Sequence, residues 1–355
     1  MVRRLLVATI AALALAACGG QASVPEAVYV EPASAAPTVS VASTWVEGLQ
    51  SPWSIVPVSD TVLVSERDTG RIVRVQADGS VGLVVTIDGV VHEGESGLLG
   101  LALSPDGDWL YAYYTSATDN RVVRMPWDGQ RAGEPEIILE GIKKETFHDG
   151  GGLAFGPDGM LYIATGDAGS PELAQDMGSL NGKILRVAPD GAIPDGNPFA
   201  DSPIYSLGHR NVQGLAFDGE GRLWATEFGT SEADELNFIV AGGNYGWPGY
   251  EGTAGAGGYI DPAAQWSPTS LASPSGLAIL DGVAYVASLR GEVVWQVPLA
   301  GDRVAEPIAL DLGDLGRLRA ITVAGPGRLL LATSNTDGRG DVRDGDDRIL
   351  VLEVR

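Results

Sequence analysis

Positive charge, histidine and cysteine are all scarce in this 355-residue chain. It has 23 Lys and Arg residues against 46 Asp and Glu, with three histidines and one cysteine. This acidic balance excludes nucleic acid as an expected partner, because phosphate binding needs a surplus of positive charge. Hydrophobic residues make up 45% of the chain, so most of it can bury a core and disorder is excluded for that part.

Charged residues are also few, at 19%, whereas glycine is abundant, with 49 residues. This composition favours many short strands joined by tight turns over long solvent-exposed helices. A Gly/Asp-rich turn followed by an alternating strand recurs six times, at 59–66, 104–115, 156–166, 218–229, 280–289 and 324–334. The spacing of roughly 45 to 60 residues is that of one four-stranded blade. We therefore predict an all-β fold, a six-bladed β-propeller of four-stranded antiparallel blades over 42–355; six copies disfavour a β-sandwich.

The N-terminal apolar run is too short to span a bilayer. It covers Leu5–Ala17, follows two arginines and ends at Cys18, the sole cysteine, in a pattern that resembles the bacterial lipobox. We predict a lipoprotein signal peptide over 1–17, then a lipidated Cys18 and a flexible Pro/Ala/Ser-rich tether over 18–41. The protein would be extracytoplasmic, in a bacterial cell envelope, held at the membrane by lipid alone. The alternative is an ordinary secretory peptide with an incidental thiol.

The polar residues that flank the repeated phrases are the candidate site. Ligands of a propeller usually lie at one mouth of its central channel, on loops between strands. The third copy places His148 before its strand and Asp167 after it, and the fourth has Arg210, Asn211 and Gln213 in the equivalent position before the strand. The glycines at 150–152 either let a flat ligand or the channel wall approach the backbone, or are ordinary turn residues.

Arginines are informative because basic residues are rare. Arg210, Arg290, Arg317 and Arg319 each fall beside a repeated phrase, so four guanidinium groups can point into one mouth. Guanidinium groups match carboxylates in a bidentate geometry, which predicts a polyanionic ligand. For any single arginine, a salt bridge with the acidic surface is the simpler interpretation.

Five ordered motifs resemble one known family. They are "HDGGGLAFGPDGMLYIATGD", "LNGKILRVAPDG…NPF", "GHRNVQGLAFD", "EFGTSEADELNFIVAGGNYGWP" and "PSGLAIL…ASLRG". Together they resemble the soluble aldose dehydrogenases that depend on pyrroloquinoline quinone (PQQ), the glucose/sorbosone dehydrogenase family, over about 42–355. The resemblance implies a six-bladed propeller with PQQ and one Ca²⁺ at the channel mouth, an aldose substrate oxidised at C1 to a lactone, and an external electron acceptor.

The resemblance also implies roles for individual residues. His148 aligns with the general base that takes the proton of the anomeric hydroxyl, Asp167 with the carboxylate that orients it, and Arg210 with the side chain that stabilises charge on the reduced quinone. Asp149 is the less favoured partner of His148. The remaining positions that align with cofactor contacts are Asn211, Gln213, Arg290, Arg317 and Arg319, and the backbone carbonyls that align with calcium ligands are those of Gly229 and Thr230.

The sequence departs from the glucose-oxidising branch of that family at three positions, one of which, Glu95, aligns with a sugar contact. Thr230 replaces a proline, Arg290 stands where lysine is usual, and Glu95 stands where that branch has a sugar-contacting glutamine. These differences, with short loops, indicate the broader aldose dehydrogenase branch, with wide sugar selectivity.

Two other function classes stay open, a Ca²⁺-dependent lactonase on the same scaffold and a binding lipoprotein without chemistry. Lactonase sites hold their metal with several Asn, Asp and Glu side chains, whereas arginines dominate this mouth. We expect no chemistry from His92 or His209, and either stacking or core packing from Tyr245, Trp247 and Trp266. The Asp-rich run 335–348 lacks the pattern of a calcium loop, and we expect a solvated turn there.

Overall fold

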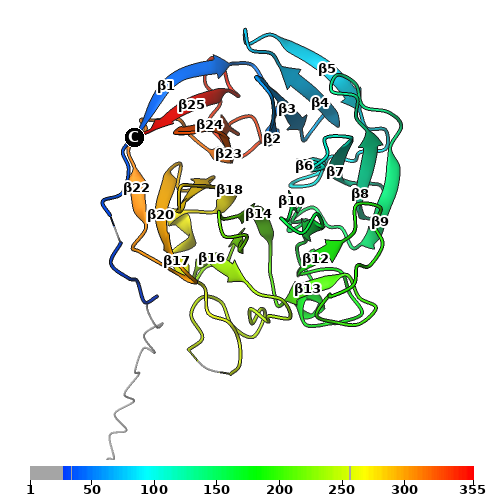
Figure 1. Cartoon of the computed structure of the whole chain (residues 1–355), viewed down its shortest axis with the longest axis vertical. Coiled ribbons are helices and arrows are strands. Elements are labelled where there is room, and N and C mark those ends of the chain that lie inside the picture. Colours follow the sequence, from blue (N-terminus) through cyan, green and yellow to red (C-terminus); the bar gives the residue numbers. More distant parts are fainter. Residues whose placement is uncertain (1–26, 33, 256) are drawn as a thin grey trace, which may run out of the picture.

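Six β-sheets surround a central channel in this computed structural model, which describes residues 27–32, 34–255 and 257–355 (Figure 1). That part of the chain forms 25 strands and two short 3₁₀ helices, η1 (Pro171–Ala174) and η2 (Thr269–Leu271), and no α-helix. The predicted six-bladed β-propeller is confirmed. The predicted signal peptide and Cys18 lie outside the described residues.

Each of the first five blades runs from an innermost strand at the channel to an outermost strand, with every neighbouring pair antiparallel. Blade 1 contains β2 (Pro52–Val58), β3 (Thr61–Glu66), β4 (Arg71–Val75) and β5 (Val81–Thr86). Blade 2 contains β6 (Leu98–Leu103), β7 (Trp109–Thr115), β8 (Asn120–Pro126) and β9 (Glu136–Ile142). Blade 3 contains β10 (Leu153–Phe155), β11 (Leu161–Ala164), β12 (Lys183–Val187) and β13 (Ile204–Leu207).

Blades 4 and 5 continue the ring. Blade 4 contains β14 (Val212–Phe217), β15 (Leu223–Glu227), β16 (Asp234–Ile239) and β17 (Ala264–Trp266). Blade 5 contains β18 (Pro274–Leu280), β19 (Val283–Ser288) and β20 (Val294–Ala300), and two short strands, β21 (Arg303–Val304) and β22 (Ile308–Leu310), both pair with β20 at its outer edge.

Blade 6 joins the two ends of the chain. It contains β23 (Leu318–Gly325), β24 (Arg328–Thr333) and β25 (Ile349–Val354), and its outermost strand is β1 (Val39–Val46), paired from Val39 opposite Val354. The propeller therefore begins at Val39 and not at 42, which corrects the predicted tether boundary at 41. The cause is that closing the ring requires one strand from the far end of the chain, and this strand covers the edge of β25.

The six repeated phrases correspond to one element of each blade. Each supplies the turn before the second strand and that strand itself: β3, β7, β11, β15, β19 and β24. Apolar residues of neighbouring sheets then pack into six buried clusters, one at each junction between blades. At the junction of blades 2 and 3, for example, the fully buried Tyr111 and Tyr113 pack with Leu161 and Ile163. Burial of this apolar area is the main term that fixes adjacent blades to one another.

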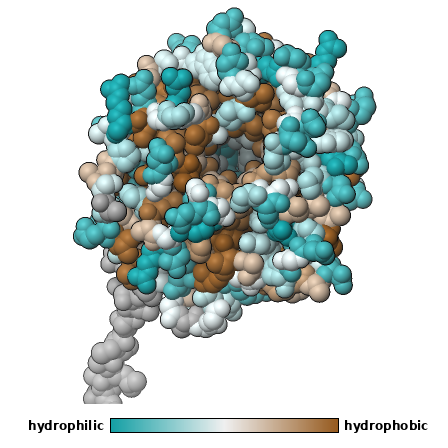
Figure 2. Space-filling model, in the orientation of Figure 1, coloured by the Kyte–Doolittle hydropathy of each residue, from teal (hydrophilic) through white to brown (hydrophobic). Residues whose placement is uncertain are grey.

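The innermost strands line a channel of about 360 Å³, and Figure 2 shows a hollow at the centre of one face. Glycines of these strands allow the blades to approach closely. A Cβ on Gly152 would lie 2.4 Å from the carbonyl oxygen of Gln213 in the next blade, so the channel wall, and not a ligand, requires this glycine. No helix within the described ranges is long and apolar enough to cross a membrane.

Candidate active site

The loops before each innermost strand and after each second strand lie at the same end of the ring, because these strands are antiparallel neighbours. His148 precedes β10 and Asp167 follows β11, whereas Arg210 precedes β14 and Gly229 follows β15. Loops from blades 1, 2, 5 and 6 return to this end in the same way. The predicted site residues of the described chain therefore gather at this end of the ring. Gln213 and Arg319 lie in the innermost strands β14 and β23, near the start of each strand, and the others lie on the loops.

His148 and Asp167 form a hydrogen-bonded pair. Nδ1 of His148 lies 2.8 Å from Oδ1 of Asp167, whose side chain is 1% exposed, while the imidazole is 16% exposed. An ionised carboxylate only accepts, so Nδ1 carries the proton and Nε2 is left as a proton acceptor. Asp167 is held in turn by the indole N–H of Trp247, 2.9 Å from Oδ2, and by the backbone N–H of Gly169, 2.9 Å from Oδ1.

The backbone of His148 is constrained as well. Its φ of +58° is uncommon for a residue other than glycine. Its N–H donates to Oε2 of Glu95 at 3.0 Å, and the ring of Phe147 meets the imidazole edge-on. Asp149 does not contact the imidazole: its carboxylate accepts from Ser96 and Asn120, and burial raises its pKa. Asp149 therefore supports the loop, and Asp167 is the partner of the His148 imidazole.

Arg210 lies beside this pair. Its Nη1 donates to the carbonyl oxygens of Phe228 at 2.9 Å and Gly229 at 2.6 Å, and its guanidinium lies 5.5 Å from the ring of Trp247. Burial lowers the pKa of Arg210, and nearby carboxylates, Asp167 first, oppose that shift. Among the described residues, its Nε and the Nδ2 of the neighbouring Asn211 are buried donors without a hydrogen-bond partner. Two donors are therefore available at this point of the mouth.

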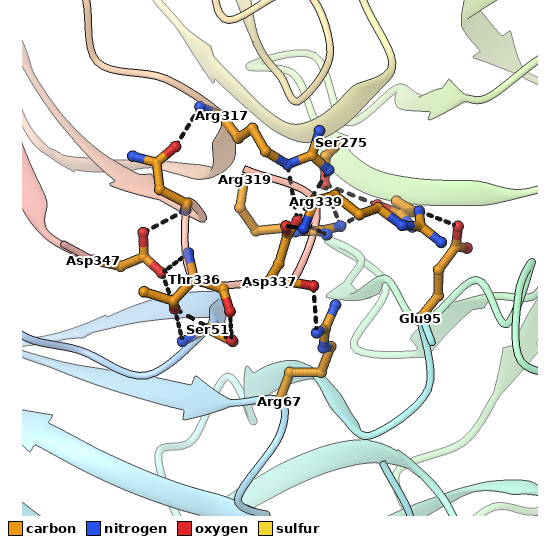
Figure 3. A network of polar contacts seen from close by, with 12 residues as sticks. Ser51, Arg67, Glu95, Ser275, Arg317, Arg319, Thr336, Asp337, Arg339 and Asp347 are labelled. Carbon is orange, nitrogen blue, oxygen red and sulfur yellow. Dashed lines mark hydrogen bonds and ion pairs between the residues drawn. The ribbon is translucent and has the colours of Figure 1, made fainter. Parts of the chain in front are cut away.

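A second group of arginines surrounds Asp337, as Figure 3 shows. Arg317 and Arg319 share Oδ2 of Asp337, with Nη2 atoms at 2.9 Å and 3.8 Å. Arg319 also donates to Oε1 of Gln213 at 2.8 Å, and Gln213 accepts from Ser275 at 2.9 Å. Burial lowers the pKa of Arg319, and its Nε has no partner within the described part of the chain.

Glu95 is joined to the opposite side of the mouth by an ion pair. Its Oε1 lies 2.8 Å from Nη1 of Arg339, which is on the loop after β24 (Figure 3). Its Oε2 accepts the N–H of His148. Burial raises the pKa of Glu95, but the contacts with Arg339 and His148 outweigh it and leave the pKa below its ordinary value. Arg290, in contrast, is exposed after β19 and makes no hydrogen bond or ion pair with the described residues.

The predicted metal ligands, Gly229 and Thr230, occupy the loop after β15. The N–H of Gly229 donates to Oδ1 of Asp234 at 2.9 Å, and Thr230 donates to Glu251 through both its N–H and its hydroxyl. Across the described residues, no three or more His, Cys, Asp or Glu side chains are grouped to hold a metal ion. The two predicted ligands are backbone carbonyl oxygens, so the lack of such a side-chain group in the described residues does not bear on them.

The remaining histidines and aromatic residues pack within the protein or lie at its surface. His209 is fully buried between Ser206 and Glu227, each at 2.8 Å, and stacks on Tyr245. Trp266 packs against a second tryptophan in the core, and the exposed His92 lies 3.3 Å from Asp68. Trp247 is the aromatic residue of the site itself.

The run 335–348 is solvated only in its middle, where Gly338, Arg339, Asp341, Val342 and Asp344 are exposed, so the expectation of a solvated turn is wrong at both ends of the run. Asp337 is buried in the arginine group, and Asp347 is fully buried, where its carboxylate accepts from Thr333, Asn335 and Thr336. The carboxylates of Asp337, Asp346 and Asp347 accept hydrogen bonds from donors of the protein itself.

Several contacts of the mouth are absent from the sequence-based prediction. Glu251, Arg339 and Arg67 were not predicted, and neither was the role of Trp247 or Asp337 as a partner of site residues. Arg67 donates to the carbonyl oxygen of Asp337 at 3.2 Å. A signal existed for two of them. Arg67 and Arg339 follow the first and sixth repeated phrases, as Asp167 follows the third.

Comparison with known proteins places this architecture in context. The chain matches the family described as glucose/sorbosone dehydrogenase over residues 49–344. It is similar to the solved PQQ-bound form of aldose sugar dehydrogenase from Streptomyces coelicolor, at 51% identity and a TM-score of 0.88, over 92% of this chain and 100% of that one. It is also similar to quinoprotein glucose dehydrogenase B of Acinetobacter calcoaceticus, 35% identical over 56% of this chain and 50% of the relative, and to aldose sugar dehydrogenase YliI of Escherichia coli, 28% identical over 86% and 92%.

Proposed function

The chain belongs to the glucose/sorbosone dehydrogenase family, and we propose that it is a PQQ- and Ca²⁺-dependent dehydrogenase that oxidises the C1 hydroxyl of aldoses to lactones. Electrons pass to an external acceptor. One observation carries the proposal: Asp167 holds Nδ1 of His148, which leaves Nε2 as a proton acceptor, at the end of the ring where the arginines and buried donors suit a polyanion.

The residues of the mouth fit PQQ, a planar orthoquinone with three carboxylates. Arg210 Nε, Asn211 Nδ2 and Arg319 Nε are buried donors without partners among the described residues, and a buried unpaired donor costs about 1–3 kcal/mol. A ligand rich in acceptor oxygens removes that cost. The side chains proposed to hold it are those of Arg210, Asn211, Gln213, Arg290, Arg317 and Arg319.

His148 is proposed as the general base. Its Nε2 takes the proton of the anomeric hydroxyl while hydride leaves C1, and the negative charge of Asp167 stabilises the imidazolium that forms. PQQ, when bound, would supply the two-electron acceptor for that hydride, and Ca²⁺ would supply Lewis-acid chemistry beside it. Arg210 would stabilise the negative charge of the reduced quinone, and its burial would strengthen this interaction.

The proposed ligands that the protein contributes to Ca²⁺ are the carbonyl oxygens of Gly229 and Thr230. Carbonyl oxygens are suitable ligands for this hard cation. The Gly229 oxygen accepts from Arg210 and has a second lone pair, so it can serve both groups. Thr230 contributes only its carbonyl, so the side chain at that position need not match the proline of the glucose-oxidising branch.

Glu95 is proposed to contact the sugar. It lies at the mouth, where its carboxylate contacts both the backbone of His148 and Arg339. A carboxylate held by an ion pair presents acceptors, whereas the glutamine of the glucose-oxidising branch also presents donors. Selectivity among aldoses should therefore differ from that branch. We further propose an extracytoplasmic location through Cys18, on the strength of the sequence pattern.

The test is a titration of the Ca²⁺-loaded protein with PQQ, followed by absorbance, and then by a panel of aldoses with a dye as the external acceptor. Saturable binding and aldose-dependent dye reduction would support the proposal. Absence of PQQ binding at excess Ca²⁺ would overturn it, and lactone hydrolysis by the same preparation would favour the lactonase.

A further inference from the structure

One carboxylate organises the loop that carries the proposed calcium ligands. Oε1 of Glu251 accepts the N–H groups of four consecutive residues, 230–233, at 2.8, 3.2, 2.9 and 3.0 Å. Its Oε2 accepts the hydroxyl of Thr230 at 2.6 Å. Glu251 comes from the long segment after β16, so the contact links two loops some twenty residues apart in sequence.

The geometry of the peptide unit makes this contact directional. In a planar trans peptide the C=O of one residue points opposite to the N–H of the next. Since the N–H groups of Thr230 and Ser231 point at Glu251, the carbonyls of Gly229 and Thr230 must point away from it. The Gly229 oxygen does so, because it accepts from Nη1 of Arg210, a group of the channel mouth.

The loop is closed tightly over the carboxylate. A Cβ on Gly229 would lie 2.5 Å from Oε1 of Glu251 and 1.9 Å from the carbonyl oxygen of Ala233, so only glycine fits this close approach. On the other side of Gly229, Oδ1 of Asp234 accepts its N–H and so orients the carbonyl of Phe228, which also meets Arg210. Both oxygens of Glu251 accept hydrogen bonds from the loop, so the carboxylate affects the proposed calcium site by holding the loop and not as a ligand.

We infer that Glu251 is the positioning residue of the calcium site: it fixes the carbonyls of Gly229 and Thr230 toward the cofactor before Ca²⁺ binds. The inference rests on the proposed function, which supplies the metal. Fixing ligands in advance removes the ordering cost of two backbone groups from the binding step. Partners that orient metal ligands contribute on the order of 10–100-fold to affinity, and we expect a loss in that range without Glu251.

The experiment measures the Ca²⁺ concentration that half-saturates PQQ binding, by absorbance, with no sugar present. Glu251→Ala should raise that concentration at least tenfold, and Glu251→Gln, which keeps one acceptor oxygen, should raise it less. Glu232→Gln is the matched control: Glu232 is an exposed carboxylate of the same loop, and removing its charge should leave the value within about twofold.

A second readout separates positioning from a purely structural role. Ca²⁺ with PQQ should raise the melting temperature of the wild type, and the increment should shrink in Glu251→Ala, whereas a structural residue would lower the melting temperature equally with and without ligands. Unchanged Ca²⁺ dependence in Glu251→Ala, with a normal wild type, overturns the inference alone. A wild type whose PQQ binding ignores Ca²⁺ overturns the proposed calcium site and this inference with it.

Discussion

Asp167→Asn tests the hydrogen-bonded pair in detail. The carboxylate accepts three hydrogen bonds, from His148, Gly169 and Trp247. An amide has one acceptor oxygen and one donor group, so it cannot accept all three. With its oxygen toward the imidazole, its NH₂ meets the indole N–H. With its oxygen toward the indole, its NH₂ forces Nδ1 to accept, which moves the imidazole proton to Nε2 and blocks the base.

Either orientation also removes the negative charge beside the imidazolium. Two unit charges about 4 Å apart interact by about 4 kcal/mol at an effective dielectric constant of 20. The imidazolium exists only after proton transfer, so this energy is lost from the transition state and not from the ground state. At about 1.4 kcal/mol per power of ten, kcat should fall on the order of 1,000-fold.

The assay is steady-state aldose oxidation with a dye acceptor, paired with PQQ titration to show that the cofactor still binds. Trp247→Phe is the control: it removes one hydrogen bond to the same carboxylate but keeps the charge, and should cost about tenfold or less. Near-normal kcat in Asp167→Asn, or a larger loss in Trp247→Phe, would refute the role given to this carboxylate.

Three further predictions concern selectivity and stability. Arg339→Ala frees Glu95 from its ion pair and should change the ratio of kcat/KM values among aldoses several-fold while PQQ affinity stays constant. An unchanged ratio would contradict a role of Arg339 in sugar selectivity. Lys183→Met leaves three buried carbonyls without the ammonium group that donates to them, and urea denaturation should show that the free energy of unfolding falls by about 3 kcal/mol. A fall of less than about 1 kcal/mol would contradict the stabilising role of these three hydrogen bonds. Burial, together with Glu227, raises the pKa of Glu235 from 4.5 to about 8, so the folded state retains a proton and the stability of the wild type falls as pH rises from 4.5 to about 8. Glu235→Gln cannot ionise, so its stability relative to the wild type should grow from pH 5 to pH 9. A difference that stays constant over this range would contradict the raised pKa.

The blades could be predicted from sequence because their signal is local. A turn and the strand after it lie within about twelve residues, so the six phrases located β3, β7, β11, β15, β19 and β24 without any knowledge of pairing. The closure of blade 6 has no local signal. Val39 pairs with Val354, at the opposite end of the chain, and the start of β1 resembles the end of a Pro/Ala/Ser-rich tether until its partner is known.

The same distinction applies to the site. His148 and Asp167 flank one repeated phrase, so their position in the blade could be inferred from the repeat. Trp247 and Glu251 lie on the irregular segment between β16 and β17, where no repeat indicates which residue returns to the mouth. Asp337 was misassigned to a solvated turn because composition cannot show that an aspartate faces buried arginines.

The central claim is that His148 is the base of a PQQ-dependent aldose oxidation. The most direct test loads wild type and His148→Ala with Ca²⁺ and PQQ, adds an excess of aldose without any acceptor, and follows the absorbance of the quinone. We predict that both proteins bind PQQ and that only the wild type is reduced within the time of the experiment. Equal reduction in both proteins, or no reduction of the wild type by any aldose, would contradict the claim.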